Sequence, residues 1–194
     1  MDLSLRRSIY TLGNNVALSN EEIITMIKHC LKHTPAAFNA PTTNVVVAFG
    51  EKHQQIWQIV TNVLKEKMTK KPEAFELAKA KIEGFANGVG TILYYEDTSI
   101  VDELKETYAM YADNFDTWSK QANGMLQHSI WSMLAENKIG ANLQHYNPLI
   151  DDKIKKLFSI PDNWTLTAQM PFGTIKKEAK EKYFEPVENR LIVF

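Results

Sequence analysis

Residues 114–140, NFDTWSKQANGMLQHSIWSMLAENKIG, form the longest segment of the chain with helical periodicity. Its apolar residues fall on two sides of the expected helix instead of one. One stripe contains Leu126, Ile130 and Leu134, and the other contains Trp118, Ala122, Met125 and Met133. A helix that is apolar on two sides must be covered on both, at the centre of a domain or across a subunit interface. We therefore expect a helix from about Phe115 to Lys138 that takes part in a homodimer.

Gly124 lies in the middle of this segment. Glycine costs about 1 kcal/mol relative to alanine inside a helix. A close crossing of a second backbone would be one reason to keep a glycine here, because packed helices approach each other most closely where side chains are small.

The segments before this helix indicate strands and further helices. TNVVVAFG (Thr43–Gly50) and GTILYYED (Gly90–Asp97) are short, rich in β-branched or aromatic residues and apolar on both faces, which predicts two central strands. Between them, residues 52–68 and 72–87 repeat apolar residues every three or four positions and predict two helices that cover the sheet. Ser19, Glu22 and Pro35 mark the start and the end of an earlier helix.

The segments after the long helix predict a strand around Gly140–His145, a short helix from about Leu149 and a strand at residues 164–173, followed by a tail that ends RLIVF. No composition break, repeat or low-complexity run divides the chain. We therefore predict one α+β domain over residues 1–194, with helices packed on a central sheet.

Composition excludes several classes of partner. The 194 residues are 44% hydrophobic, and the formal net charge is −1. No basic field draws the chain to nucleic acid or to an anionic membrane, and no apolar run is long enough for a membrane span. A cytoplasmic protein is the expectation, because the first residues lack an apolar signal region. The single cysteine, Cys30, falls on the apolar face of its helix and is expected to be a buried, unreactive residue.

The common catalytic and nucleotide-binding motifs are missing from the sequence. It contains no phosphate-binding G-x-x-x-x-G-K-[ST] loop, no dinucleotide-binding fingerprint, no H-E-x-x-H and no G-x-S-x-G elbow. His29 and His33 are four residues apart without a neighbouring acidic ligand pattern, so no metal site is predicted. Redox chemistry, if present, would have to come from an organic cofactor.

Arginine is rare in this chain, and two of the three arginines are adjacent. Arg6 and Arg7 precede Ser8, whereas 19 of the 22 basic residues are lysine. A guanidinium is a planar fork of donors that binds phosphate bidentately, which an ammonium does not do. The pair is therefore a candidate phosphate site. The alternative is that both arginines extend from a terminal helix into solvent or pair with surface carboxylates.

Amide side chains gather in two loops beside predicted strands. Asn39 lies in HTPAAFNAPTTN, and Asn142, Gln144 and Asn147 lie in GANLQHYNP. Together with Arg6–Ser8 they match the needs of a phosphorylated, flat heterocycle, which requires cations at one end and amide groups along its edge. The competing interpretation is that Asn39 only organises a turn and that His145 is a satisfied core residue.

The order of these motifs resembles the FMN-dependent nitroreductase family. The motifs are RRSIY, TPAAFNAPTTN, YADNFDTWSKQANGMLQHSIWSMLAENKIGANLQHYNPLI, NWTLTAQMPFGT and FEPVENRLIVF, and together they span almost the whole chain. YADNF, NGM and IGANLQHYNP are similar to the compact subgroup named after a fatty-acid repression mutant. The resemblance implies a three-layer α+β sandwich with a mostly antiparallel sheet. It also implies an interlocked homodimer with two FMN molecules at its interface.

The resemblance also implies an activity and a set of site residues. NADH or NADPH would reduce FMN, and a nitroaromatic or quinone-type acceptor would reoxidise it, with no catalytic side chain required. Arg6, Arg7 and Ser8 match the phosphate motif, Asn39 the loop beside the flavin ring, and Gly140–Gln144, including Leu143, the segment that lines the ring. Arg190, with Lys182 as competitor, matches the C-terminal basic residue, and Lys81 is a candidate cation near the pyrimidine end of the ring.

Some positions depart from the family pattern. Ala36 and Ala37 replace the usual serines, Pro41 stands where glutamine is common, and Tyr10 stands where larger relatives have lysine. The loss of glutamine removes a hydrogen-bonding partner of the ring and affects flavin affinity more than fold. It leaves open a flavin-binding regulator with little turnover, and a dimer without any ligand is a third alternative.

Overall fold

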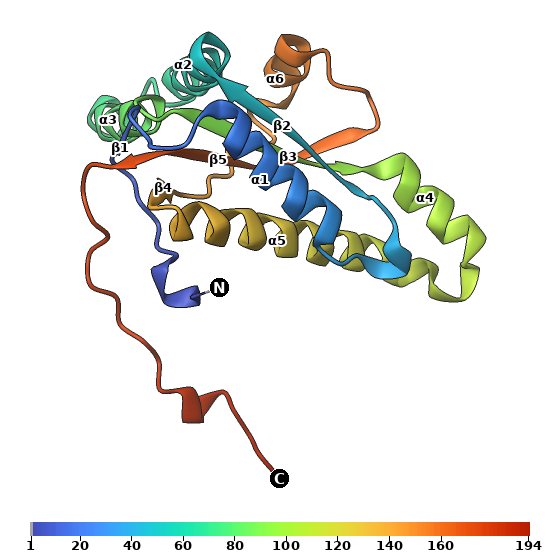
Figure 1. Ribbon diagram of the computed structural model, residues 1–194. Coiled ribbons are helices and arrows are strands. Elements are labelled where there is room, and N and C mark those ends of the chain that lie inside the picture. Colours follow the sequence, from blue (N-terminus) through green and yellow to red (C-terminus); the bar gives the residue numbers. More distant parts are fainter. Residues whose placement is uncertain (1) are drawn as a thin grey trace.

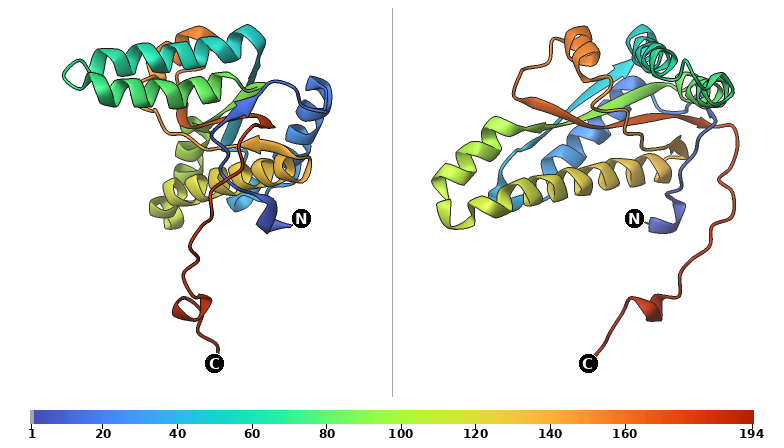
Figure 2. Two further views of the ribbon diagram at one scale, coloured as in Figure 1. Left: turned by 90° about the vertical axis from the view of Figure 1, so that its left-hand side faces the viewer. Right: turned by 180° about the vertical axis from the view of Figure 1, so that it is seen from behind.

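The computed structural model describes residues 2–194 as a sheet between two layers of helices (Figure 1). Helices α2, α3 and α6 cover one face of the sheet, and α1 and α5 cover the other (Figure 2). The predicted three-layer α+β architecture is confirmed. The helices are α1 (Asn20–His33), α2 (Gly50–Lys67), α3 (Pro72–Ala86), α4 (Thr98–Thr107), α5 (Ala112–Glu136) and α6 (Asp151–Phe158). The strands are β1 (Leu12–Gly13), β2 (Thr43–Phe49), β3 (Gly90–Asp97), β4 (Ile139–Ala141) and β5 (Trp164–Ile175).

The sheet is antiparallel between all named strands, in the order β1-β5-β3-β2 with β4 paired to β5. Strand β3 is buried along its whole length, as predicted for a central strand. The prediction that β2 is also central is wrong. Strand β2 pairs only with β3 among the described residues, and most of its side chains are half-buried. Its valines pack on both faces of the sheet, Val45 and Val47 on the side of α1 and α5 and Val46 on the side of α2.

Helix α5 has one fully buried side and one exposed side. Leu126, Ile130 and Leu134 are buried against the sheet, whereas Met125 is 42% exposed. The close backbone crossing expected at Gly124 does not occur within the chain, because a Cβ added there meets no atom within 4 Å. The second apolar stripe is therefore covered only in part, because Ala122 is buried and Trp118 and Met133 are half-buried while Met125 is exposed.

The polar side chain of Asn123 ties α5 to an irregularity in the sheet. The pairing of β3 with β5 shifts register between Tyr94 and Tyr95. Asn123 is buried, and its amide nitrogen donates to the Tyr95 carbonyl oxygen at 3.1 Å. A shifted register leaves backbone groups without ladder partners, and the asparagine supplies one such partner.

Several element boundaries follow from local chemistry. The predicted cap of α1 is confirmed, because the Ser19 hydroxyl accepts from the Glu22 backbone N–H and the Glu22 carboxylate accepts from the Ser19 N–H. The predicted strand around Gly140–His145 ends earlier, at Ala141, and α6 begins at Asp151 instead of Leu149. Helix α4 was not predicted. It begins where the Asp97 carboxylate, at the end of β3, accepts from the N–H groups of the next turn.

A buried histidine links α2 to the sheet. The Nδ1 of His53 lies 2.8 Å from the Thr91 hydroxyl, and its Nε2 lies 3.0 Å from the Ala86 carbonyl oxygen. The Trp57 indole donates to the same Thr91 hydroxyl at 2.9 Å. The carbonyl requires a proton on Nε2, so the neutral ring accepts from Thr91 through Nδ1. Burial lowers the pKa of His53.

The C-terminal segment leaves the body of the protein after β5 (Figure 1). Residues 181–194 are all exposed, although the segment ends in LIVF. Phe184, Ile192 and Val193 are each at least 70% exposed. Within the described residues no helix has both the length and the apolar character needed to cross a bilayer.

Candidate functional site

The two N-terminal arginines begin an extended segment that is fixed to β4. Ser8 forms a parallel bridge with Ala141, and the Ile9 N–H donates to the Ala141 carbonyl oxygen at 2.9 Å. The Asn142 amide donates to the Ile9 carbonyl oxygen at 2.7 Å. Ala141 and Asn142, which follow α5, therefore fix the backbone of Ser8 and Ile9.

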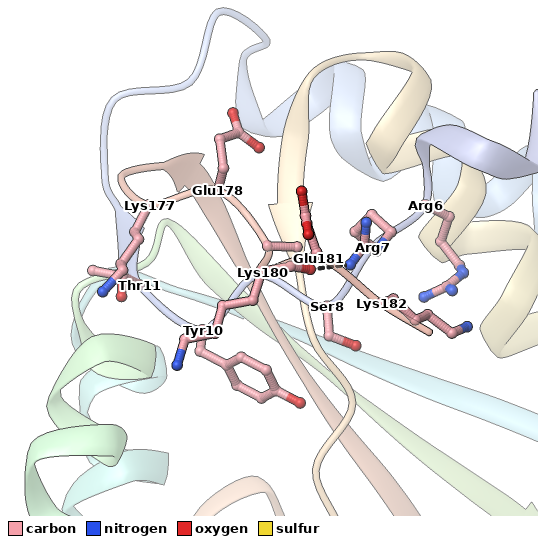
Figure 3. Close-up of a pocket in the computed structure, with 11 residues that line it drawn as sticks. Arg6, Arg7, Ser8, Tyr10, Thr11, Lys177, Glu178, Lys180, Glu181 and Lys182 are labelled. Atoms are coloured by element: carbon pink, nitrogen blue, oxygen red, sulfur yellow. Dashed lines mark hydrogen bonds between the residues drawn. The ribbon is translucent and has the colours of Figure 1, made fainter. Parts of the chain in front are cut away.

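This segment and the start of the C-terminal tail enclose a cavity of about 610 Å³ (Figure 3). Its walls are residues 6–8, 10, 11 and 177–182. Five of these side chains are cationic and two are carboxylates, which gives a formal charge of +3. A cavity of this charge attracts anions.

Arg6 and Arg7 make different contacts in this cavity. The Arg7 guanidinium donates to the Lys180 carbonyl oxygen and so holds the tail. The Arg6 guanidinium lies over the Trp131 ring, 4.5 Å from its centroid. Within residues 2–194, Arg6 makes no hydrogen bond or ion pair, so its N–H groups are available to a ligand.

Tyr10 and Lys81 form one side of the cavity. The Lys81 ammonium lies 5.1 Å from the centre of the Tyr10 ring and 5.6 Å from that of Phe85. Tyr10 lines the cavity, whereas Lys81 itself is not among the lining residues. The Tyr10 ring therefore contacts both the cavity and the candidate cation Lys81.

The predicted ring-lining segment follows β4 directly. Gly140 is buried, and a Cβ there would lie within 3.0 Å of Ile9 and Ile175 side-chain atoms, so glycine lets β4 approach the Ser8 segment. Leu143 is half-buried against the core formed by α1, α5 and the sheet. The Gln144 amide donates to the Asn142 side-chain oxygen at 2.8 Å. One N–H of that amide is therefore used within the chain, in support of Asn142.

Asn39 lies in a strained turn away from the cationic cavity. Phe38 and Asn39 have φ values of 55° and 53°, in the left-handed region. Asparagine tolerates this region, whereas phenylalanine rarely adopts it. In Figure 1 the turn, in light blue, lies beside the end of α5 nearest α4, and the N-terminus lies at the other end. Asn39 lines a second cavity of about 640 Å³, together with residues from α1 and α5.

The structure thus brings some predicted site residues together and separates others. Arg6, Arg7, Ser8 and Lys182 share one cavity, with Lys81 behind its wall. Asn39 lies at the other end of α5, and Arg190 lies in the exposed tail, outside both cavities. No group of three or more metal-ligating side chains occurs among residues 2–194.

Sequence reasoning missed an aromatic cluster around Phe38. Its ring centre lies 4.4 Å from that of Tyr108 and 5.5 Å from that of Phe115. The remaining members are Tyr111 and Trp118, each about 6.2 Å from Phe38. The spacing of the aromatic residues at 108, 111, 115 and 118 is a helical stripe and could have identified this cluster. Trp131 was also missed, since nothing in the sequence pairs it with Arg6.

Comparisons with known proteins agree on one family. The model of the nitroreductase family matches residues 3–174. HBN1 of Saccharomyces cerevisiae is 29% identical over 194 residues, which cover 99% of this chain and 94% of HBN1. The nitroreductase FRM2 of the same yeast is 28% identical over 182 residues, covering 92% and 89% of the two chains.

A solved structure shows the same relationship. The nitroreductase CinD from Lactococcus lactis in complex with nicotinic acid superimposes with a TM-score of 0.92 and 41% identity, over 99% of this chain and 97% of CinD. The resemblance to the compact subgroup that includes FRM2 is confirmed. The chain therefore belongs to the nitroreductase family.

Proposed function

We propose that the protein is a homodimeric, FMN-dependent NAD(P)H oxidoreductase that reduces nitroaromatic or quinone-type acceptors. The family and the fold support a flavin-dependent oxidoreductase. The observation that carries the finer proposal is the cationic cavity between residues 6–11 and 177–182. An FMN phosphate needs such a cavity, whereas an unphosphorylated ligand would not.

The donors in the cavity fit a phosphate group. Arg6 offers an unpaired guanidinium fork, Ser8 offers a hydroxyl, and Lys182 offers an ammonium on the facing segment (Figure 3). Arg7 lines the same cavity, but its guanidinium is hydrogen-bonded to the Lys180 carbonyl oxygen. Arg6, Ser8 and Lys182 would therefore hold the phosphate, while Arg7 holds the tail that carries Lys182.

Bound FMN would supply the hydride transfer chemistry, so the chain itself needs only to bind, orient and polarise. Gly140 allows β4 to lie against the Ser8 segment and so fixes the hydroxyl. Lys81, beside Tyr10 at the cavity wall, is the cation available to offset negative charge on the ring. No acid, base or nucleophile among the described residues is assigned a role in the reaction.

A homodimer would complete the site. Phe38 contacts Trp118 and Arg6 contacts Trp131, and thirteen residues of helix separate these two contacts by about 20 Å. If two copies of α5 pack antiparallel about a two-fold axis, each end of one helix lies near the opposite end of the other. Asn39 of the partner subunit would then lie near Arg6, which one chain alone does not achieve.

The exposed side of α5 and the tail support this dimer. Gly124 and Met125 present a helix surface with no covering group, and the tail carries Tyr183, Phe184 and Phe194 into solvent. Exposed apolar surface of this kind is typical of an interface. The tail would pack on the partner subunit and carry Arg190 with it.

The test is to purify the full-length protein, identify any bound chromophore and measure NADH and NADPH oxidation with a nitroaromatic and a quinone. We expect bound FMN, and we expect the double variant R6Q/S8A to lose it. K65Q is the matched control, because Lys65 is an exposed residue of α2 on the opposite side of the sheet. A wild-type protein that neither contains nor binds FMN would refute the proposal. Tight FMN binding without turnover would instead support the flavin-binding regulator.

A further inference from the structure

The Arg6 guanidinium lies over an aromatic ring that packs against the core. Trp131 belongs to α5 and packs against the core formed by α1, α5 and the sheet. The Arg6 guanidinium carbon lies 4.5 Å from the centre of this ring. Within residues 2–194 Arg6 has no hydrogen bond or ion pair, so this cation–π contact is what orders its side chain.

The backbone on both sides of Arg6 is also fixed. Before it, residues 3–5 form a short 3-10 helix against α5, where the Asp2 N–H donates to the Glu136 carboxylate at 3.1 Å. After it, Ser8 and Ile9 are joined to Ala141 of β4. The backbone of residues 2–9 is thus fixed at both ends. The conformational entropy that remains to be lost on ligand binding is mainly that of the long Arg6 side chain.

A stacked guanidinium keeps its donors free. All N–H groups of a guanidinium lie in its own plane, and a cation–π contact uses none of them as a conventional hydrogen-bond donor. This geometry orders the side chain before a ligand arrives and leaves a complete fork for an anion. Pre-ordering of this kind increases affinity because less conformational entropy is lost on binding.

We infer that Trp131 is a positioning residue that holds Arg6 for the phosphate of a flavin, and so makes the protein select FMN over riboflavin. The inference rests on the proposed function. Arg7 does not share this role, because its guanidinium is committed to the Lys180 carbonyl oxygen. The adjacent arginines therefore have separate tasks: Arg6 binds the anion, and Arg7 fastens the segment that bears Lys182.

Trp131 can be replaced without breaking a hydrogen bond of its side chain. Its Nε1 is buried and has no hydrogen-bond partner in the structure of residues 2–194. A change to phenylalanine or leucine therefore removes no hydrogen bond. W131F keeps an aromatic face under the guanidinium, and W131L removes it. K65L is the control, because Lys65 is an exposed residue of α2 on the opposite side of the sheet.

The experiment measures dissociation constants of FMN and riboflavin for the flavin-free, full-length protein by flavin fluorescence. We expect W131L to lower the preference for FMN over riboflavin by about 3- to 30-fold, the range of a cation–π contact. W131F should retain most of the preference, and K65L should leave it unchanged. In an R6Q background, W131L should have no further effect on the preference, because the group it positions is gone.

Three outcomes would overturn the inference: an unchanged preference in W131L, an equal loss of affinity for both flavins, or a full effect of W131L in the R6Q background. Circular dichroism spectra confirm folding, and W131M, which also removes the aromatic face, replaces W131L if W131L unfolds. Wild-type protein that binds FMN with a preference insensitive to Trp131 refutes this inference alone. Wild-type protein that binds neither flavin refutes the proposed function as well.

Discussion

Substitution of Gly124 separates the properties of a single chain from those of the proposed dimer. Gly124 is exposed in the middle of α5, and a Cβ there would meet no atom of the chain within 4 Å. In a single chain, G124A should therefore stabilise the helix by about 1 kcal/mol, because alanine has the higher helix propensity. For a chain of this size, that corresponds to a rise of about 2–4 °C in the melting temperature.

G124L should act differently if a second α5 crosses at this point. A leucine side chain has the same free space within one chain, so the monomer gains most of the helix propensity. At a helix crossing, however, the added side chain forces the two backbones apart, with a cost of about 1–3 kcal/mol for overpacking. A two-fold axis places the substitution in the interface twice. The expected loss of about 2–6 kcal/mol weakens dimerisation by about 30-fold or more.

The assay is sedimentation equilibrium over a wide concentration range, combined with thermal unfolding. We expect wild-type protein at twice the chain mass and G124L shifted toward the monomer at low concentration. K65L is the control, since it adds a leucine to an exposed position of α2 on the other side of the sheet. If G124L remains a dimer as tight as wild type, the exposed side of α5 is not the interface and the antiparallel arrangement is wrong.

Three further predictions concern stability. Burial lowers the pKa of His53 in the native chain, whereas in the unfolded chain this histidine becomes protonated near pH 6.5. The unfolding free energy, measured by urea titration, should therefore fall as the pH drops below about 6.5. H53Q should remove this pH dependence, and a dependence that persists in H53Q would show that His53 is not its cause. G173A should destabilise by about 3 kcal/mol or more, because its Cβ would overlap the Gly13 carbonyl oxygen; an unfolding midpoint like that of wild type would contradict this. N123A should cost about 1–3 kcal/mol by leaving the buried Tyr95 carbonyl oxygen without its side-chain donor, and equal stability by urea unfolding would refute that role.

Local chemistry explains why some elements could be predicted from the sequence. The cap of α1 depends on Ser19 and Glu22, which are three residues apart, so the sequence contains both partners. The status of β2 depends on which strand lies beyond it, and its valines are equally compatible with a central or an edge position. Helix α4 was missed because Asp97 serves both as the last residue of β3 and as a helix cap.

In the candidate site too, some residues could be predicted from the sequence and their contacts could not. The scarcity of arginine was enough to single out Arg6 and Arg7, and the structure places both in a cationic cavity with Lys182. The difference between them arises from contacts with Trp131 and Lys180, which are more than 120 residues distant in sequence. Such pairings depend on how the tail and α5 fold back on the N-terminal segment, and no periodicity in the sequence encodes them.

The strained turn at Phe38 and Asn39 is held by the aromatic residues around it. Two successive non-glycine residues in the left-handed region cost about 1–3 kcal/mol each. Contacts of the Phe38 ring with the surrounding aromatic rings, at about 0.5–1.5 kcal/mol per pair, offset a cost of this size. The aromatic cluster thus fixes a conformation that Asn39 alone would not maintain. The cluster therefore holds the turn that carries Asn39 near one end of α5, and the contact between Arg6 and Trp131 lies toward the other end.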